Sequence, residues 1–213
     1  VLALREKWNF LKLAVGSQLN NGTSQALMLL DVCLIGVIIG SDEVISSYKV
    51  ATTIPTALSF IPNAIMTYAN PYFARNIQNR SWVRRSYFKL TLGCAAGNLI
   101  ITLGGILSAF WVIPLIFGRQ YEDAVSCFIV LMIGYFFSAS FQVLSQNIIY
   151  TQRKVRVNII ITFLSGVSNC VLDAVLIFNY GSIGAALDTT LVHVINSALC
   201  VGYLCFYLRE AKT

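Results

Sequence analysis

Charged side chains are scarce in this sequence, and their scarcity excludes the ordinary soluble proteins. Of the 213 residues, 11% are charged and 57% are hydrophobic, and the mean hydropathy is +0.72. Soluble domains carry roughly 25% charged residues. Because the hydrocarbon core of a membrane is about 30 Å thick, a spanning helix needs about 20 mostly apolar residues. Several such runs follow one another here, and they leave no room for a separate soluble domain.

Residue patterns typical of catalysis are also missing. The sequence has one histidine, no CxxC pair, no glycine-rich phosphate-binding loop and no metal-ligand cluster. The six cysteines occur singly in or near apolar runs, where we interpret them as packing residues. We therefore expect neither an enzyme nor a bound cofactor or metal.

Apolar runs separated by short polar or glycine-bearing turns predict an all-α, polytopic membrane protein. We expect residues 1–213 to form a single bundle of six transmembrane helices. Because the sequence begins at Val1 rather than at a methionine, we expect it to belong to a longer chain. The predicted helices cover about residues 9–39, 43–70, 86–117, 122–149, 155–179 and 183–207.

Basic residues are distributed unevenly along this pattern. Of the 15 lysines and arginines, all except Lys49 and Arg119 lie at the two ends of the chain or beside the second and fourth turns. The positive-inside rule places that side in the cytoplasm. The net charge of +6 is therefore interpreted as a signal of topology and not of nucleic-acid binding. The same basic face would attract anionic lipid head groups.

Ionisable residues inside predicted spans are costly and mark candidate functional sites. Asp31 and Lys49 flank the first turn at similar predicted depth. They could form a structural ion pair that fixes the first hairpin. Alternatively, Lys49 binds an anionic substrate group while Asp31 restrains Lys49 or exchanges a proton.

Two further aspartates and the single histidine lie in the last two predicted helices. Asp173 and Asp188 flank the turn at Tyr180-Gly181 at similar distances. Two carboxylates at one depth would suit proton coupling, although each could also lie in the wet interfacial region. His193 falls nearer the middle of its helix, as a hydrogen-bonded packing residue or a proton relay.

The first two predicted helices contain residues that are unusual in a membrane-spanning helix. Residues 17–25 read SQLNNGTSQ and include Gln18 and Asn21. So many amides and hydroxyls cannot all face lipid, because each unsatisfied polar group there costs several kcal/mol. They predict a polar cavity or a helix break. Pro55 and Pro62 predict kinks in the second helix.

Several stretches resemble the Wzx-type polysaccharide flippases of the MOP superfamily, which also includes MATE drug exporters and the lipid II flippase. The first half contributes LDVCLIG (30–36), YKVA (48–51), IPNA (61–64) and NPYFA (70–74). The second half contributes PLIFGRQY (114–121), NCVL (169–172) and YGSIGAA (180–186). These stretches cover most of the chain in the family's order.

The resemblance implies a fold and a function. Members of the superfamily have two six-helix lobes around a central cavity, and this chain resembles the second, C-terminal lobe. The implied activity is transport of undecaprenyl-pyrophosphate-linked oligosaccharides across the bacterial inner membrane, by alternating access coupled to an ion or proton gradient. Such transport serves the synthesis of surface polysaccharide such as O-antigen. The implied partners are the N-terminal lobe, membrane lipids and a polysaccharide polymerase.

The resemblance also implies roles for individual residues. Family cavities are lined by cationic residues that meet pyrophosphate and sugars, and Lys49 is the counterpart deep in this chain. Asp188 stands where the family pattern has a small residue, so no family role is transferred to it. The expected cavity residues are Lys49, Asp31, Gln18, Asn21 and Tyr48. Arg75, Arg84 and Arg85 are expected at the cytoplasmic entrance, where setting the topology would explain them equally well.

Two other functions remain as alternatives. A MATE-type exporter of cationic drugs would prefer uncompensated carboxylates in its site. The expected Asp31–Lys49 pair and the basic cytoplasmic face instead favour an anionic substrate. A non-transporting scaffold, or a half-transporter that needs a partner, is the third interpretation.

Overall fold

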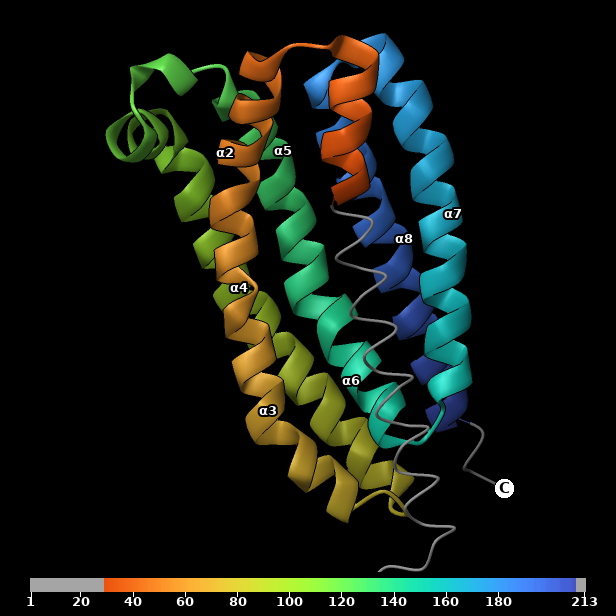
Figure 1. The fold of residues 1–213 in the computed structure, drawn as a ribbon. Coiled ribbons are helices and arrows are strands. Elements are labelled where there is room, and N and C mark those ends of the chain that lie inside the picture. Colours follow the sequence, from red (N-terminus) through yellow and green to blue (C-terminus); the bar gives the residue numbers. More distant parts are fainter. Residues whose placement is uncertain (1–28, 210–213) are drawn as a thin grey trace, which may run out of the picture.

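The computed structural model describes residues 29–209, and Figure 1 shows them as an all-helical bundle. No strand occurs within these described residues. A 3-10 turn, Arg119–Tyr121, precedes α5, and a π-helical segment, η2 (Ser138–Gln142), joins α5 to α6. The helices are Leu29–Ile39, α2 (Asp42–Leu58), α3 (Phe60–Arg75), α4 (Arg80–Phe117), α5 (Ala124–Phe137), α6 (Val143–Thr151), α7 (Val155–Tyr180) and α8 (Ser182–Arg209).

Four helical segments are long and apolar enough to cross a membrane. They are α4, the continuous stretch Ala124–Thr151, α7 and α8. These segments correspond to the helices predicted from residue 86 onward, and they are compatible with a membrane protein. The first predicted helix is described only over Leu29–Ile39. The predicted residues Gln18 and Asn21 lie outside the described residues.

The prediction of one helix over residues 43–70 is wrong. Two helices occupy this stretch, they meet at Ser59, and the second continues to Arg75. Pro62 has no amide hydrogen to donate to the Leu58 carbonyl, so the helical ladder cannot continue there. The Tyr135 hydroxyl lies 3.4 Å from that carbonyl and 3.1 Å from Asn98 Oδ1, and it has one proton to donate to either acceptor.

The helix predicted from residue 86 begins six residues earlier, at Arg80. The reason is a helix cap, because the Asn79 side chain accepts a hydrogen bond from the Trp82 amide at 3.0 Å. As a result, Arg84 and Arg85 lie on the first turns of a helix rather than in a loop.

The described helices run up and down, and α8 packs between α7 and α5. The α3–α4 turn, the α6–α7 turn and the end of α8 lie at one end of the bundle (Figure 1). Tyr207 near the end of α8 joins them, because the Arg80 guanidinium lies 4.6 Å and the Lys154 ammonium 5.4 Å from the centre of its ring. The predicted basic loops are therefore neighbours in space.

Candidate functional site

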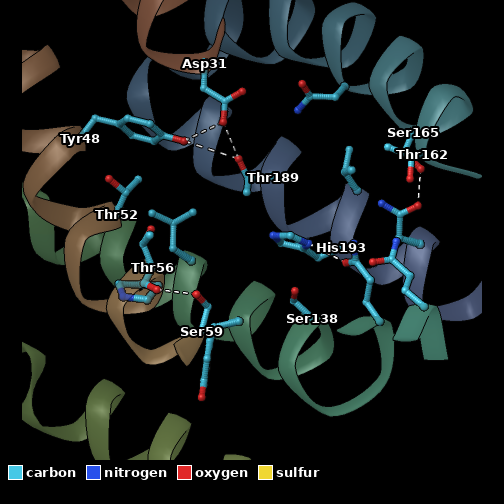
Figure 2. Close-up of a pocket in the computed structure, with 18 residues that line it drawn as sticks. Asp31, Tyr48, Thr52, Thr56, Ser59, Ser138, Thr162, Ser165, Thr189 and His193 are labelled. Atoms are coloured by element: carbon cyan, nitrogen blue, oxygen red, sulfur yellow. Dashed lines mark hydrogen bonds between the residues drawn. The ribbon is translucent and has the colours of Figure 1, made fainter. Parts of the chain in front are cut away.

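A polar cavity of about 320 Å³ opens between α2, the α5–η2–α6 segment, α7 and α8 (Figure 2). This volume is at the lower end of the range for small-molecule sites, which is about 300–1,000 Å³. Its walls carry hydroxyl, amide and aromatic side chains within an otherwise apolar bundle. The polar and aromatic lining comprises Asp31, Tyr48, Thr52, Thr56, Ser59, Tyr135, Ser138, Gln142, Gln146, Thr162, Ser165, Asn169, Thr189, His193 and Asn196.

Asp31 lies at one end of this cavity and joins three elements. Its Oδ2 atom accepts hydrogen bonds from the Tyr48 hydroxyl at 3.3 Å and from Thr189 Oγ1 at 3.0 Å. The three side chains converge in Figure 2 from the helix Leu29–Ile39, from α2 and from α8. The Asp31 side chain is 4% exposed. The predicted cavity residues Asp31 and Tyr48 are thus brought together.

The predicted ion pair between Asp31 and Lys49 does not form. Asp31 bonds to Tyr48, the neighbour of Lys49, so the predicted depth was right and the predicted face was wrong. Successive side chains on a helix point about 100° apart, so burial of Tyr48 turns Lys49 outward. Lys49 is exposed and does not line the cavity.

Asp173 on α7 and Asp188 on α8 lie beside Asp31, and both side chains are fully buried. The three carboxyl groups interact electrostatically with one another, and we call them the carboxylate cluster. Asn169 donates a hydrogen bond to Asp188 Oδ2. This burial contradicts a wet interfacial position for Asp173 and Asp188.

Several oxygens of the carboxylate cluster accept no hydrogen bond from a neutral donor among the described residues, although Asp31 and Asp173 lie close enough to share a proton. They are both oxygens of Asp173 and one oxygen each of Asp31 and Asp188. The nearby Asn169 carbonyl oxygen is also unpaired. A buried, uncompensated carboxylate costs several kcal/mol. The cluster therefore requires protons or a bound cation to neutralise it.

The chemistry of the cluster limits what can neutralise it. Among residues 29–209, no group of three or more His, Cys, Asp and Glu side chains is placed to hold a metal ion. A small cation would also need neutral oxygen ligands, for which the oxygens of Thr189, Tyr48 and Asn169 are candidates. A proton would need only the carboxylates themselves.

His193 lies across the cavity from the carboxylate cluster. Its Nδ1 atom is 2.9 Å from Oε1 of Gln142, the last residue of η2. This contact fits the prediction of a hydrogen-bonded packing residue, although the ring also lines the cavity. Single-turn π-helical segments often mark functional sites, because they turn side chains away from the regular helical register.

Arg75, Arg84 and Arg85 are exposed, and they lie on the last turn of α3 and the first turns of α4. None of them lines the polar cavity. They belong to the basic end of the bundle.

Three residues of the site were not predicted from the sequence: Thr189, Asn169 and Gln142. Asn169 precedes Asp173 by four residues, so both lie on one face of α7. That spacing could have identified it. Nothing in the sequence marks η2.

Comparison with protein-family models, with curated proteins and with solved structures finds no match for this chain.

Proposed function

We propose that this chain is one lobe of a cation-coupled transporter that moves undecaprenyl-pyrophosphate-linked oligosaccharides across the bacterial inner membrane by alternating access. The observation that carries the proposal is a polar cavity that shares Asp31 with a buried carboxylate cluster. A helical bundle that served only as a scaffold would gain nothing from uncompensated buried charge, which lowers its stability.

The cavity supports a carbohydrate cargo through the chemistry of its walls. Gln142 and Gln146 offer amide donors and acceptors, and Thr52, Thr56 and Ser59 offer hydroxyl groups. Sugar hydroxyls both donate and accept hydrogen bonds, as these side chains do. The linking pyrophosphate is anionic, and the basic end of the bundle provides the opposite charge.

Asp31 gives the cation a means of acting on the cavity. It is at once a member of the carboxylate cluster and the residue that holds Tyr48 of α2 to Thr189 of α8. Neutralising the cluster changes the acceptor strength of Asp31 and thereby the contact between α2 and α8. A ligand shifts a conformational equilibrium only through such differential contacts.

A MATE-type exporter of cationic drugs is the second candidate, and one observation favours it. The absence of an Asp31–Lys49 pair leaves the carboxylates uncompensated, as a site for cations would require. However, Asp173 and Asp188 are fully buried and do not line the cavity. Their position suits a proton or a small ion better than a drug, so we retain the flippase as the leading proposal.

The test is complementation of a flippase-deleted bacterium by the full-length gene. We expect surface polysaccharide to return and lipid-linked precursor to be cleared, and we expect Asp31→Asn to lose both effects. Asp42→Asn provides the matched control, because Asp42 is exposed at the start of α2. If precursor persists while the cells gain resistance to cationic dyes, the exporter is the better assignment.

A further inference from the structure

Polar side chains predominate on one exposed surface of α2 and α3, which also carries the exposed Phe60, and we call the polar members of this surface the polar stripe. Its members are Lys49, Thr53, Thr56, Asn63 and Thr67, all of which are exposed. In α2 they recur at i, i+4 and i+7, and in α3 at i and i+4, so each set lies along one helix face. Thr56 also lines the polar cavity, so the polar stripe continues into it.

The exposed surface of α4 is the opposite in character. From residue 91 to residue 117, the exposed side chains of α4 are apolar or small. Its polar residues in that stretch, such as Thr91, Asn98 and Thr102, are buried. This bundle therefore turns polar groups inward where a helix faces lipid. The polar stripe departs from that rule, which indicates that it does not face lipid.

Hydrogen bonds within the helices explain only part of the polar stripe. Thr53 and Thr67 each donate to the carbonyl four residues earlier, at 2.8 Å. Hydroxyls satisfied in this way are tolerated in lipid. Asn63 donates one amide hydrogen to the Ser59 carbonyl at 2.8 Å. Its second amide hydrogen and its carbonyl oxygen need other partners.

Lys49 is a second indication that the polar stripe does not face lipid. A lysine at the centre of a membrane helix costs about 2.5–3.5 kcal/mol on insertion scales. Lys49 lies well inside α2, one turn from Thr53, and it forms no ion pair with Asp31. Water or an anionic group beside the polar stripe would remove that cost.

We propose that the polar stripe lines a water-filled path for an anionic group, with Lys49 as the cation that receives it. The path runs from the basic end of the bundle, where Arg75 is the last residue of α3, to the polar cavity. The identity of the cargo rests on the proposed function, but access of water to the polar stripe does not.

The first experiment measures water access by cysteine labelling of the full-length protein in membranes. In a background with Cys33→Ser and Cys170→Ser, a membrane-impermeant maleimide is applied to Asn63→Cys and Leu92→Cys. Leu92 lies about as far along α4 from the α3–α4 turn as Asn63 lies along α3, and it is 74% exposed. A thiol reacts as its thiolate, which apolar surroundings disfavour, so we expect labelling at Asn63 to be at least about tenfold faster.

The same comparison is repeated with Thr53→Cys against Leu103→Cys, since Leu103 is half exposed on α4. Cysteines of the polar stripe that label as slowly as those of α4 would place the stripe in lipid or in a dry interface with another lobe. Either result would overturn the inference.

The second experiment tests the preference for anions. Negatively and positively charged methanethiosulfonates are compared at Thr53→Cys, with Lys49 present and after Lys49→Gln. We expect the negative reagent to be favoured only while Lys49 is present, and Thr67→Cys to show no change because it lies on α3. An unchanged ratio at Thr53 would refute the role of Lys49. Because neither experiment uses transport as its readout, failure here and failure of complementation are distinguishable.

Discussion

Asp173 is the residue at which burial and charge conflict most sharply. It is fully buried, and neither of its carboxylate oxygens accepts a hydrogen bond from a neutral donor among the described residues. Asp173→Asn removes the charge at nearly constant volume and supplies an amide donor to Asp31 or Asp188. Satisfying one buried acceptor is worth about 1–3 kcal/mol. We therefore expect the full-length protein in detergent, without added sodium, to unfold at a higher temperature.

The same variant should lose its response to cations. Wild-type protein should be stabilised by sodium chloride relative to choline chloride, or by mild acid, because either cation neutralises the carboxylate cluster. Asp173→Asn should show a smaller response, while Asp42→Asn should respond like the wild type. If Asp173→Asn is less stable and responds fully to cations, the coupling role is wrong.

Lys49 is predicted to act in transport and not in stability. Because it is exposed and unpaired with Asp31, Lys49→Ala should change the free energy of unfolding by less than about 0.5 kcal/mol. Breaking a buried ion pair would instead cost about 3–5 kcal/mol. Export of polysaccharide should fall in Lys49→Ala and be partly retained in Lys49→Arg, which keeps the charge. Full export in both variants would remove Lys49 from the path.

At the scale of the helices, Gly184 sets the approach of α8 to α7. A Cβ atom at this position would overlap the backbone carbonyl of Leu176. Gly184→Ala should therefore destabilise the protein by about 1–3 kcal/mol, the range expected for overpacking. Thermal unfolding followed by size-exclusion chromatography measures the change.

Gly97→Ala on α4 is the matched control, because a Cβ atom there would meet nothing within 4 Å. Alanine is favoured over glycine inside a helix by about 0.5–1 kcal/mol, so this variant should be neutral or slightly stabilised. Equal stability of the two variants would show that α7 and α8 can separate freely at Gly184.

Helices could be predicted where the sequence alone determines their ends. The α7–α8 turn follows from Gly181, whose φ of +63° suits glycine. The break at Ser59 could not be located in this way. Pro55 and Pro62 each free a carbonyl four residues earlier, at Ala51 and Leu58, and the sequence alone does not show at which of these two positions the helix breaks. The π-helical turn of η2 likewise has no local signal.

At the scale of the whole molecule, the carboxylate cluster shows why the site was only half predicted. Residue counting from each turn placed Asp31 near the depth of Lys49, and Asp173 near the depth of Asp188. In the structure, the helix Leu29–Ile39 packs against α8, and the hydrogen bond from Thr189 to Asp31, 158 positions apart in the sequence, brings Asp31 to the pair of Asp173 and Asp188. Helical periodicity within one hairpin carries no information about such a contact.

Charge also divides the whole molecule, and it yields a last prediction. Arg75, Arg84 and Lys154 lie at one end of the bundle, whereas acidic residues such as Asp42 and Glu122 lie at the other. Moving one positive charge across 100 mV costs about 2.3 kcal/mol, so the basic end should stay in the cytoplasm.

Gln78→Cys at the basic end should be labelled only in inside-out vesicles. Gln120→Cys, a matched exposed glutamine at the acidic end, should be labelled only in intact cells. The reverse pattern would invert the bundle and place Arg75 at the outer mouth of the proposed path, where it could not receive a cytoplasmic substrate.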